Sequence, residues 1–73
     1  MATIDVRTDI TGSVWKIVKR VGDRVAEDEP ILILESMKME IPVVATDAGV
    51  ILEILVKEGD TVSEGAVAAR IEA

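Results

Sequence analysis

The sequence has no cysteine and no histidine, and Trp15 is its only aromatic residue. Without cysteine no disulfide can brace so short a chain, so its stability must come from packing. The usual nucleophile, the common general base and the best transition-metal ligands are missing as well. We therefore expect a protein that is not an enzyme and holds no metal, with the acidic run Glu27–Glu29 as a solvated turn rather than a cation site.

A surplus of basic residues and a long apolar run are also lacking. The 14 acidic and 8 basic side chains give a net charge of −6, which is unfavourable for binding phosphates or an anionic membrane. No apolar run approaches the roughly 20 residues that cross a bilayer, and the first residues do not resemble a signal peptide. These absences predict a cytoplasmic, monomeric protein with no nucleic-acid and no membrane partner.

The chain is instead rich in valine and isoleucine, whose branched side chains favour strands over helices. Its 73 residues predict one domain that spans residues 1–73. A domain of this size buries only roughly 60% of the surface of its unfolded chain. We therefore expect almost every apolar residue to be needed in the core.

An internal repeat relates residues 12–35 to residues 49–72 at a spacing of 37 positions without a gap. Seven of the 24 aligned positions are identical, including the pairs Gly12/Gly49, Gly22/Gly59 and Asp23/Asp60. Chance recurrence of Gly-Asp turns is the alternative explanation. Because the register holds across the whole unit, the pattern favours a duplication.

The pattern of each repeat unit predicts, in order, a glycine, an apolar strand, a Gly-Asp turn, a short strand centred on valine and a final apolar strand. We expect Gly12, Gly22, Gly49 and Gly59 to be structural turn residues, with positive φ at Gly22 and Gly59. Two such units predict a sandwich with approximate twofold symmetry.

Two stretches need separate interpretation. Residues 50–56 have apolar residues at helical as well as strand spacing, but the segment is short and β-branched and lies between two glycines, which favours a strand. The continuous apolar run Ile31–Leu34 follows Pro30 and predicts a strand buried on both faces.

Between the two units lies the segment 35–40, Glu-Ser-Met-Lys-Met-Glu, with apolar strands on both sides. If Ile31–Glu35 and Glu40–Val44 pair as a hairpin, the chain reverses at Met37 and Lys38, so that Leu34 faces Ile41. The same register places the two glutamates opposite each other, where like charges repel.

This turn lacks the Asn-Gly or Asp-Gly pair that tight hairpins prefer. Its two methionines would place flexible, polarizable side chains on an exposed tip, which indicates a surface that another protein recognises. The structural alternative is that Lys38 is an ordinary solvated lysine and that Met37 and Met39 fill the core.

The run Glu35-Ser36-Met37-Lys38-Met39 resembles the Glu-Ala-Met-Lys-Met signature of biotinyl domains, the carrier parts of biotin-dependent carboxylases and decarboxylases. The paired Gly-Asp turns, the chain length and the central lysine also match the biotinyl/lipoyl family, so the resemblance covers nearly the whole chain. It implies an all-β barrel-sandwich hybrid, a flattened barrel of two four-stranded antiparallel sheets. The protruding loop of some bacterial carriers is absent, as in the compact type.

The resemblance assigns roles to individual residues. Lys38 matches the lysine that carries covalent biotin, and Met37 and Met39 match the flanking methionines that the biotin ligase recognises. Glu35 matches the family glutamate, and Ser36 replaces the usual alanine with a similarly small residue, so attachment should survive. Lipoyl domains typically have Asp-Lys-Ala at the tip, which this sequence lacks.

The function implied is that of a biotin carrier, which accepts biotin from a biotin protein ligase and carries a carboxyl group between biotin carboxylase and carboxyltransferase components. The sequence offers no activating group for Lys38, so the ligase is expected to supply the base. A lipoyl carrier on the same scaffold is one alternative. A structural interaction module with an unmodified lysine is the other.

Overall fold

A computed structural model of the protein describes residues 2–73, and this part of the chain contains eight strands and no helix that could cross a membrane. The strands are β1 (Thr3–Arg7), β2 (Gly12–Ile17), β3 (Arg24–Val25), β4 (Pro30–Ser36), β5 (Met39–Val44), β6 (Gly49–Ile54), β7 (Thr61–Val62) and β8 (Val67–Glu72).

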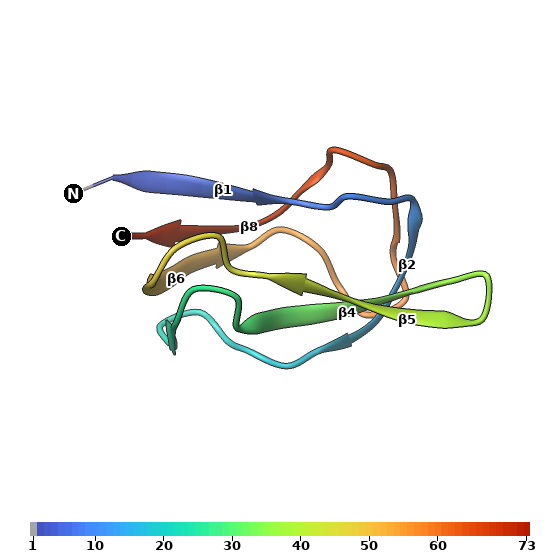
Figure 1. Ribbon diagram of the computed structural model, residues 1–73, viewed down its shortest axis with the longest axis horizontal. Coiled ribbons are helices and arrows are strands. Elements are labelled where there is room, and N and C mark those ends of the chain that lie inside the picture. The colour runs from blue at the N-terminus through green and yellow to red at the C-terminus, as the bar shows by residue number, and fades with distance from the viewer. Residues whose placement is uncertain (1) are drawn as a thin grey trace.

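These strands form two four-stranded antiparallel sheets (Figure 1). Sheet A has the strand order β1-β8-β6-β3, and sheet B has the order β5-β4-β2-β7. The expected all-β fold is confirmed, and β6 shows that most of the segment with helical spacing is a strand. Side chains from both sheets form one core, in which the largest fully buried residues are Ile31, Leu32, Leu34, Ile51, Ile71, Val6 and Val14.

The 37-residue repeat is present in the structure, because β2, β3 and β4 correspond to β6, β7 and β8 at that spacing. Each Gly-Asp turn is held by the opposite unit. The Gly22 amide donates to the Ile51 carbonyl and the Gly59 amide donates to the Val14 carbonyl, both at 2.8 Å. The two units therefore interlock through equivalent hydrogen bonds rather than lying side by side as separate halves.

Both Gly-Asp turns have the same backbone conformation, with φ of 94° at Gly22 and 95° at Gly59. This is the left-handed region that glycine adopts without strain. In each turn the aspartate fixes the loop, since a side-chain oxygen of Asp23 accepts from the Arg20 amide and that of Asp60 accepts from the Lys57 amide, each at 2.9 Å.

The other two glycines of the repeat have a different role from the one expected. Gly12 and Gly49 are not turn residues but the first residues of β2 and β6. A Cβ on Gly12 would lie 2.8 Å from the Glu35 carbonyl oxygen, and one on Gly49 would overlap the Glu72 carbonyl. These positions need glycine because another strand passes too close for a side chain.

The expectation that Ile31–Leu34 is buried on both faces is wrong. Ile31, Leu32 and Leu34 are fully buried, but Ile33 is only half-buried, on the outer face of sheet B. The register of β4 against β5 shifts between Pro30 and Leu32. This β-bulge lets two neighbouring residues turn inward, which strict alternation would forbid.

The expectation that almost every apolar residue lies in the core is also wrong. Trp15 is 49% exposed, and Leu52, its equivalent in the second repeat, is 36% exposed. Each is the extra residue where the strand register shifts, in β2 between Val14 and Lys16 and in β6 between Ile51 and Glu53. The bulges therefore turn these side chains away from the core.

Candidate functional site

The segment between the repeats forms a hairpin that extends beyond the body of the sandwich, at the right of Figure 1. Strands β4 and β5 pair with Leu34 opposite Ile41, Glu35 opposite Glu40 and Ser36 opposite Met39. The register expected from the sequence is confirmed. Each strand is one residue longer toward the tip than expected, so Met37 and Lys38 alone form the connecting loop.

Both loop residues have positive φ, 51° at Met37 and 66° at Lys38. Two consecutive positive φ angles are typical of a type I′ turn, which matches the twist of the flanking strands but favours asparagine and glycine. A residue with a Cβ loses about 1 kcal/mol or more in this region. The tip is therefore a strained turn made from residues that do not suit its backbone, as is common at functional sites.

The side chains of the tip lie in solvent. Met37 is 93% exposed and Met39 is 63% exposed, so neither fills the core. Lys38 is exposed as well, and among residues 2–73 its amine has no hydrogen-bond or ion-pair partner. The tip offers a freely accessible amine flanked by two apolar, flexible side chains.

The base of the hairpin explains why a small residue precedes Met37. Ser36 is half-buried, and its Cβ would lie 3.4 Å from a side chain at Gly12. The glycine thus makes room where β2 begins beside β4, and a large residue at position 36 would remove that room. Serine fits this place as alanine would, because only one oxygen is added.

The carboxylates of Glu35 and Glu40 stand opposite each other across the hairpin, and both are exposed. Neither forms an ion pair with any of residues 2–73. With Lys38 between them, the tip has a formal charge of −1. If the lysine amine became an amide, its positive charge would be lost and the formal charge of the tip would be −2.

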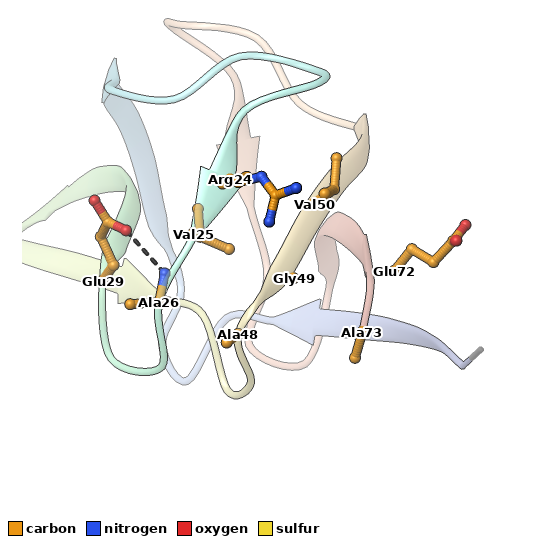
Figure 2. Close-up of a pocket in the computed structure, with 9 residues that line it drawn as sticks. All are labelled: Arg24, Val25, Ala26, Glu29, Ala48, Gly49, Val50, Glu72 and Ala73. Carbon is orange, nitrogen blue, oxygen red and sulfur yellow. Dashed lines mark hydrogen bonds between the residues drawn. The ribbon is translucent and has the colours of Figure 1, made fainter.

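An open pocket lies away from the hairpin. It is an open groove of about 620 Å³ bordered by Arg24, Val25, Gly49 and Glu72, at the end where Ala2 and Ala73 pair (Figures 1 and 2). Neither this groove nor the smaller pocket beside β5 is lined by any residue from 35 to 40. A group attached at Lys38 would therefore stand in solvent rather than in a cavity of this chain.

The acidic run Glu27–Glu29 forms a turn in which Glu29 has a structural role. Its carboxylate accepts from the Lys19 ammonium at 2.7 Å and from the Ala26 amide at 2.9 Å. These two hydrogen bonds lower the pKa of Glu29, and the bond to Glu29 raises the pKa of Lys19. Among residues 2–73 no group of three or more histidine, cysteine or acidic side chains is arranged to hold a metal ion.

Fold and site together define a class of protein: a twofold-repeated barrel-sandwich domain that presents one lysine at the tip of a hairpin. The family model described as "biotin-requiring enzyme", of the biotin/lipoyl type, matches residues 3–71. The chain is 45% identical over 62 residues to the biotin/lipoyl attachment protein of Bacillus subtilis, a match that covers 85% of each chain. The chain belongs to the biotin/lipoyl attachment family.

Two solved structures show the same fold. The urea carboxylase of Kluyveromyces lactis matches with a TM-score of 0.93 and 38% identity, covering 99% of this chain but 6% of the carboxylase. The lipoyl domain of the 2-oxoglutarate dehydrogenase complex of Azotobacter vinelandii matches with a TM-score of 0.71 and 36% identity, covering 86% of this chain and 80% of that domain. The chain is thus a small carrier-type domain similar to parts of both carboxylases and dehydrogenase complexes.

Proposed function

We propose that this protein is a biotin carrier and that Lys38 is its attachment site. The observation that carries the proposal is the isolation of the Lys38 amine, exposed on a two-residue turn and without a partner among residues 2–73. An enzyme can reach this amine without unfolding any part of the sandwich. The exposed tip also leaves a long cofactor arm free to swing between active sites.

The attachment chemistry is an acyl transfer at the lysine amine. The neutral Nζ of Lys38 attacks the carbonyl carbon of an activated biotinyl-adenylate, an amide bond forms, and AMP leaves with the electrons of the broken acyl–phosphate bond. An ammonium group has no free electron pair, so the amine must lose a proton before it attacks. Among residues 2–73 no side chain forms a hydrogen bond or an ion pair with Nζ, and we propose that the ligase accepts the proton.

Bound biotin would supply a nitrogen that takes up and releases a carboxyl group. The role of this chain is to hold the attachment point on a rigid, core-anchored hairpin and so to raise the local concentration of the carried group at each partner. The partners we propose are a biotin protein ligase and the carboxylase and carboxyltransferase components of one biotin-dependent system. We further propose that the chain works in the cytoplasm and is a monomer in isolation.

The tip supports biotin over lipoate as the cofactor. Met37 and Met39 are largely exposed, and their apolar surface is available to a ligase that recognises methionine on both sides of the lysine. A lipoyl tip typically carries an acidic and a small residue at these places. Because relatives of both kinds share this fold, the choice between the cofactors rests on the tip residues.

Intact mass measurement tests this proposal. The purified chain is incubated with ATP, biotin and a bacterial biotin protein ligase, and in parallel with ATP, lipoate and a lipoate ligase. We expect a gain of one biotinyl unit in the native chain only with the biotin ligase. Lys38→Arg should gain no mass and should keep the melting temperature of the native chain, because the exposed Lys38 side chain has no hydrogen-bond or ion-pair partner among residues 2–73.

Three results would overturn the assignment. Biotin on the Lys38→Arg variant would place the attachment site elsewhere. Lipoylation of the native chain in preference to biotinylation would assign the other cofactor. If neither ligase modifies the chain while a control carrier is modified, the protein is an interaction module instead.

A further inference from the structure

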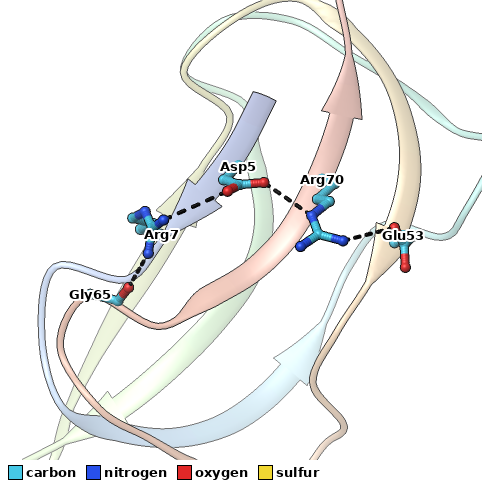
Figure 3. A network of polar contacts seen from close by, with 5 residues as sticks. All are labelled: Asp5, Arg7, Glu53, Gly65 and Arg70. Carbon is cyan, nitrogen blue, oxygen red and sulfur yellow. Dashed lines mark hydrogen bonds and ion pairs between the residues drawn. The ribbon is translucent and has the colours of Figure 1, made fainter. Parts of the chain in front are cut away.

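The outer face of sheet A carries a row of charged side chains across its three longer strands. Arg70 in β8 stands between Glu53 in β6 and Asp5 in β1. The Arg70 guanidinium donates to an oxygen of Asp5 at 3.0 Å and to one of Glu53 at 3.2 Å, and Arg7 pairs with the other Asp5 oxygen at 3.6 Å (Figure 3). These side chains form one connected polar network along the row.

The equivalent row in sheet B is made of different residues. At the spacing of 37 positions, Glu53, Arg70 and Asp5 correspond to Lys16, Ile33 and Pro42. These three residues also stand side by side, with Ile33 opposite Lys16 on one flank and Pro42 on the other. Two of its three residues, Ile33 and Pro42, are apolar where their counterparts are charged. Trp15 lies next to this row at the β2 bulge and is 49% exposed, whereas its equivalent in sheet A, Leu52, is 36% exposed.

The fold does not require this apolar row. Sheet A shows that the same backbone, at the same register, accepts a glutamate, an arginine and an aspartate on its outer face. A module this small gains little from apolar side chains in solvent, and Trp15 together with Pro42 adds apolar surface outside the core. An aromatic residue and an aliphatic residue on an exposed surface are typical of contact with another protein.

The apolar row also continues into the hairpin. From Ile33 and Pro42 the two strands lead directly to the opposed Glu35 and Glu40 and then to the tip. Three residue steps along each strand separate the row from the last pair before the tip, Ser36 and Met39, which at about 3.3 Å per residue is roughly 10 Å. The surface therefore combines an apolar patch near the tip with two carboxylates that have no ion-pair partner among residues 2–73.

We propose that the outer face of sheet B, defined by Trp15, Lys16, Ile33 and Pro42, is a docking surface for the ligase that acylates Lys38; this inference rests on the proposed function. A ligase must bring its active site to within one lysine side chain of the tip, so its surface has to extend over a flank of the hairpin. Of the two sheets, only sheet B leads into that hairpin.

Charge defines the complementary surface on the ligase. The unpaired Glu35 and Glu40 carboxylates, with the Glu58 carboxylate held at the β2 end by the Ile17 amide at 3.0 Å, border the apolar patch. They require basic side chains around an apolar contact area on the partner. Attraction of this kind weakens as salt rises, which gives the proposal a second measurable property.

The test exchanges the outer row of sheet B for that of sheet A. The triple variant Lys16→Glu, Ile33→Arg, Pro42→Asp introduces residues that the equivalent positions already hold as an ion-paired row. With purified bacterial biotin protein ligase, ATP and biotin, we expect KM for the carrier to rise about tenfold with little change in kcat, as loss of about 1.4 kcal/mol of binding would produce. The variant is also more negative, which by itself would strengthen attraction to a basic ligase.

Two control variants separate docking from folding. Glu53→Lys with Arg70→Ile alters the matching row of sheet A, which lies away from the hairpin, and should leave KM unchanged. Ile33→Leu keeps an apolar side chain and should behave as the native chain does, whereas Ile33→Arg alone should reproduce part of the rise in KM. Thermal melts identify any variant whose loss of folding would account for its kinetics.

Failure of the docking surface can be distinguished from failure of the proposed function. A native chain that takes no biotin contradicts the proposed function before docking is tested. A native chain that is biotinylated, with a folded triple variant of unchanged KM, overturns the docking surface. A KM that does not rise when the ionic strength is raised from about 0.05 to about 0.5 M overturns the proposed basic partner surface.

Discussion

The Gly-Asp turns and the Met-Lys turn require the same kind of backbone but supply it differently. At Gly22 and Gly59 positive φ falls on glycine, and an aspartate next to each closes the loop with a hydrogen bond of 2.9 Å. At Met37 and Lys38 positive φ falls on two residues with long side chains. No side-chain hydrogen bond within residues 2–73 holds that tip.

The difference indicates what each turn is for. A turn that serves only the fold uses the residues its backbone favours, and the duplicated Gly-Asp turns do so in both units. A turn that keeps unfavourable residues is held in place by the strands around it, here by the pairing of β4 with β5, in which Leu34 is fully buried. The strain at the hairpin tip thus marks residues whose side chains matter more than their backbone preference.

The largest effect on stability is expected at the Gly-Asp turns. Gly22→Ala and Gly59→Ala place a Cβ at positive φ, where no neighbouring atom lies within 4 Å, so strain alone should cost about 1–2 kcal/mol. For a domain of this size that lowers Tm by roughly 4–8 °C per kcal/mol. Calorimetric or circular-dichroism melts of both variants measure the loss.

Asparagine provides the matched control at the same positions. Because asparagine adopts positive φ more readily than alanine, Gly22→Asn and Gly59→Asn should cost less than the alanine variants. Equal losses for alanine and asparagine would show that something other than φ sets the cost. If the alanine variants melted at the temperature of the native chain, the Gly-Asp turns would not depend on glycine, and they would not differ from the hairpin tip in this respect.

A smaller effect of opposite sign is expected at the tip. Met37→Asn places a residue suited to the first position of a type I′ turn at a φ of 51°, and should raise the stability by about 0.5–1 kcal/mol. The same substitution should lower the rate of biotinylation, because the ligase loses the methionine. Melting temperature and modification rate are measured on the same preparation.

Met37→Ala is the control, since it removes the methionine without relieving the backbone. It should slow biotinylation to a similar extent and leave Tm close to that of the native chain. If Met37→Asn melts below the native chain, the tip is not strained and the comparison of the two kinds of turn fails.

Much of this architecture can be predicted from the sequence. The repeat at 37 positions predicts two equivalent units in a sandwich, and the glutamates at 35 and 40 fall opposite each other as their spacing indicates. Such features follow from the internal repeat and from the local sequence of each turn.

Features that depend on close approach between strands could not be predicted in this way. The bulges that expose Trp15 and turn both Ile31 and Leu32 inward follow from strand pairing, which has no local sequence signal here. The contact that requires glycine at position 12 involves the Glu35 carbonyl, 23 residues further along the chain. At the site, the missing Asn-Gly pair indicated an unusual turn, but the positive φ at Lys38 became evident only from the structure.

The smallest effect concerns a turn that differs between the repeats. Asp28 has a φ of 69° where the second unit has Gly65, and the adjacent Glu29 braces this turn through Lys19 and the Ala26 amide. Because the pKa of Glu29 is lowered in the folded chain, its contribution is present above the ordinary glutamate pKa of about 4.3 and is lost as pH falls through the lower folded value. Glu29→Gln keeps an acceptor for the Ala26 amide but removes the ion pair, so Tm should fall slightly at pH 7.

The pH dependence distinguishes this ion pair from a general effect of charge. The difference in Tm between Glu29→Gln and the native chain should shrink as pH falls below about 4.3 and vanish once the native carboxyl is protonated. Glu27→Gln removes a neighbouring carboxylate that makes no ion pair with residues 2–73, and it should show no such convergence. A difference at Glu29 that persists at low pH would mean that shape rather than charge braces the turn, as glycine does at the equivalent place in the second unit.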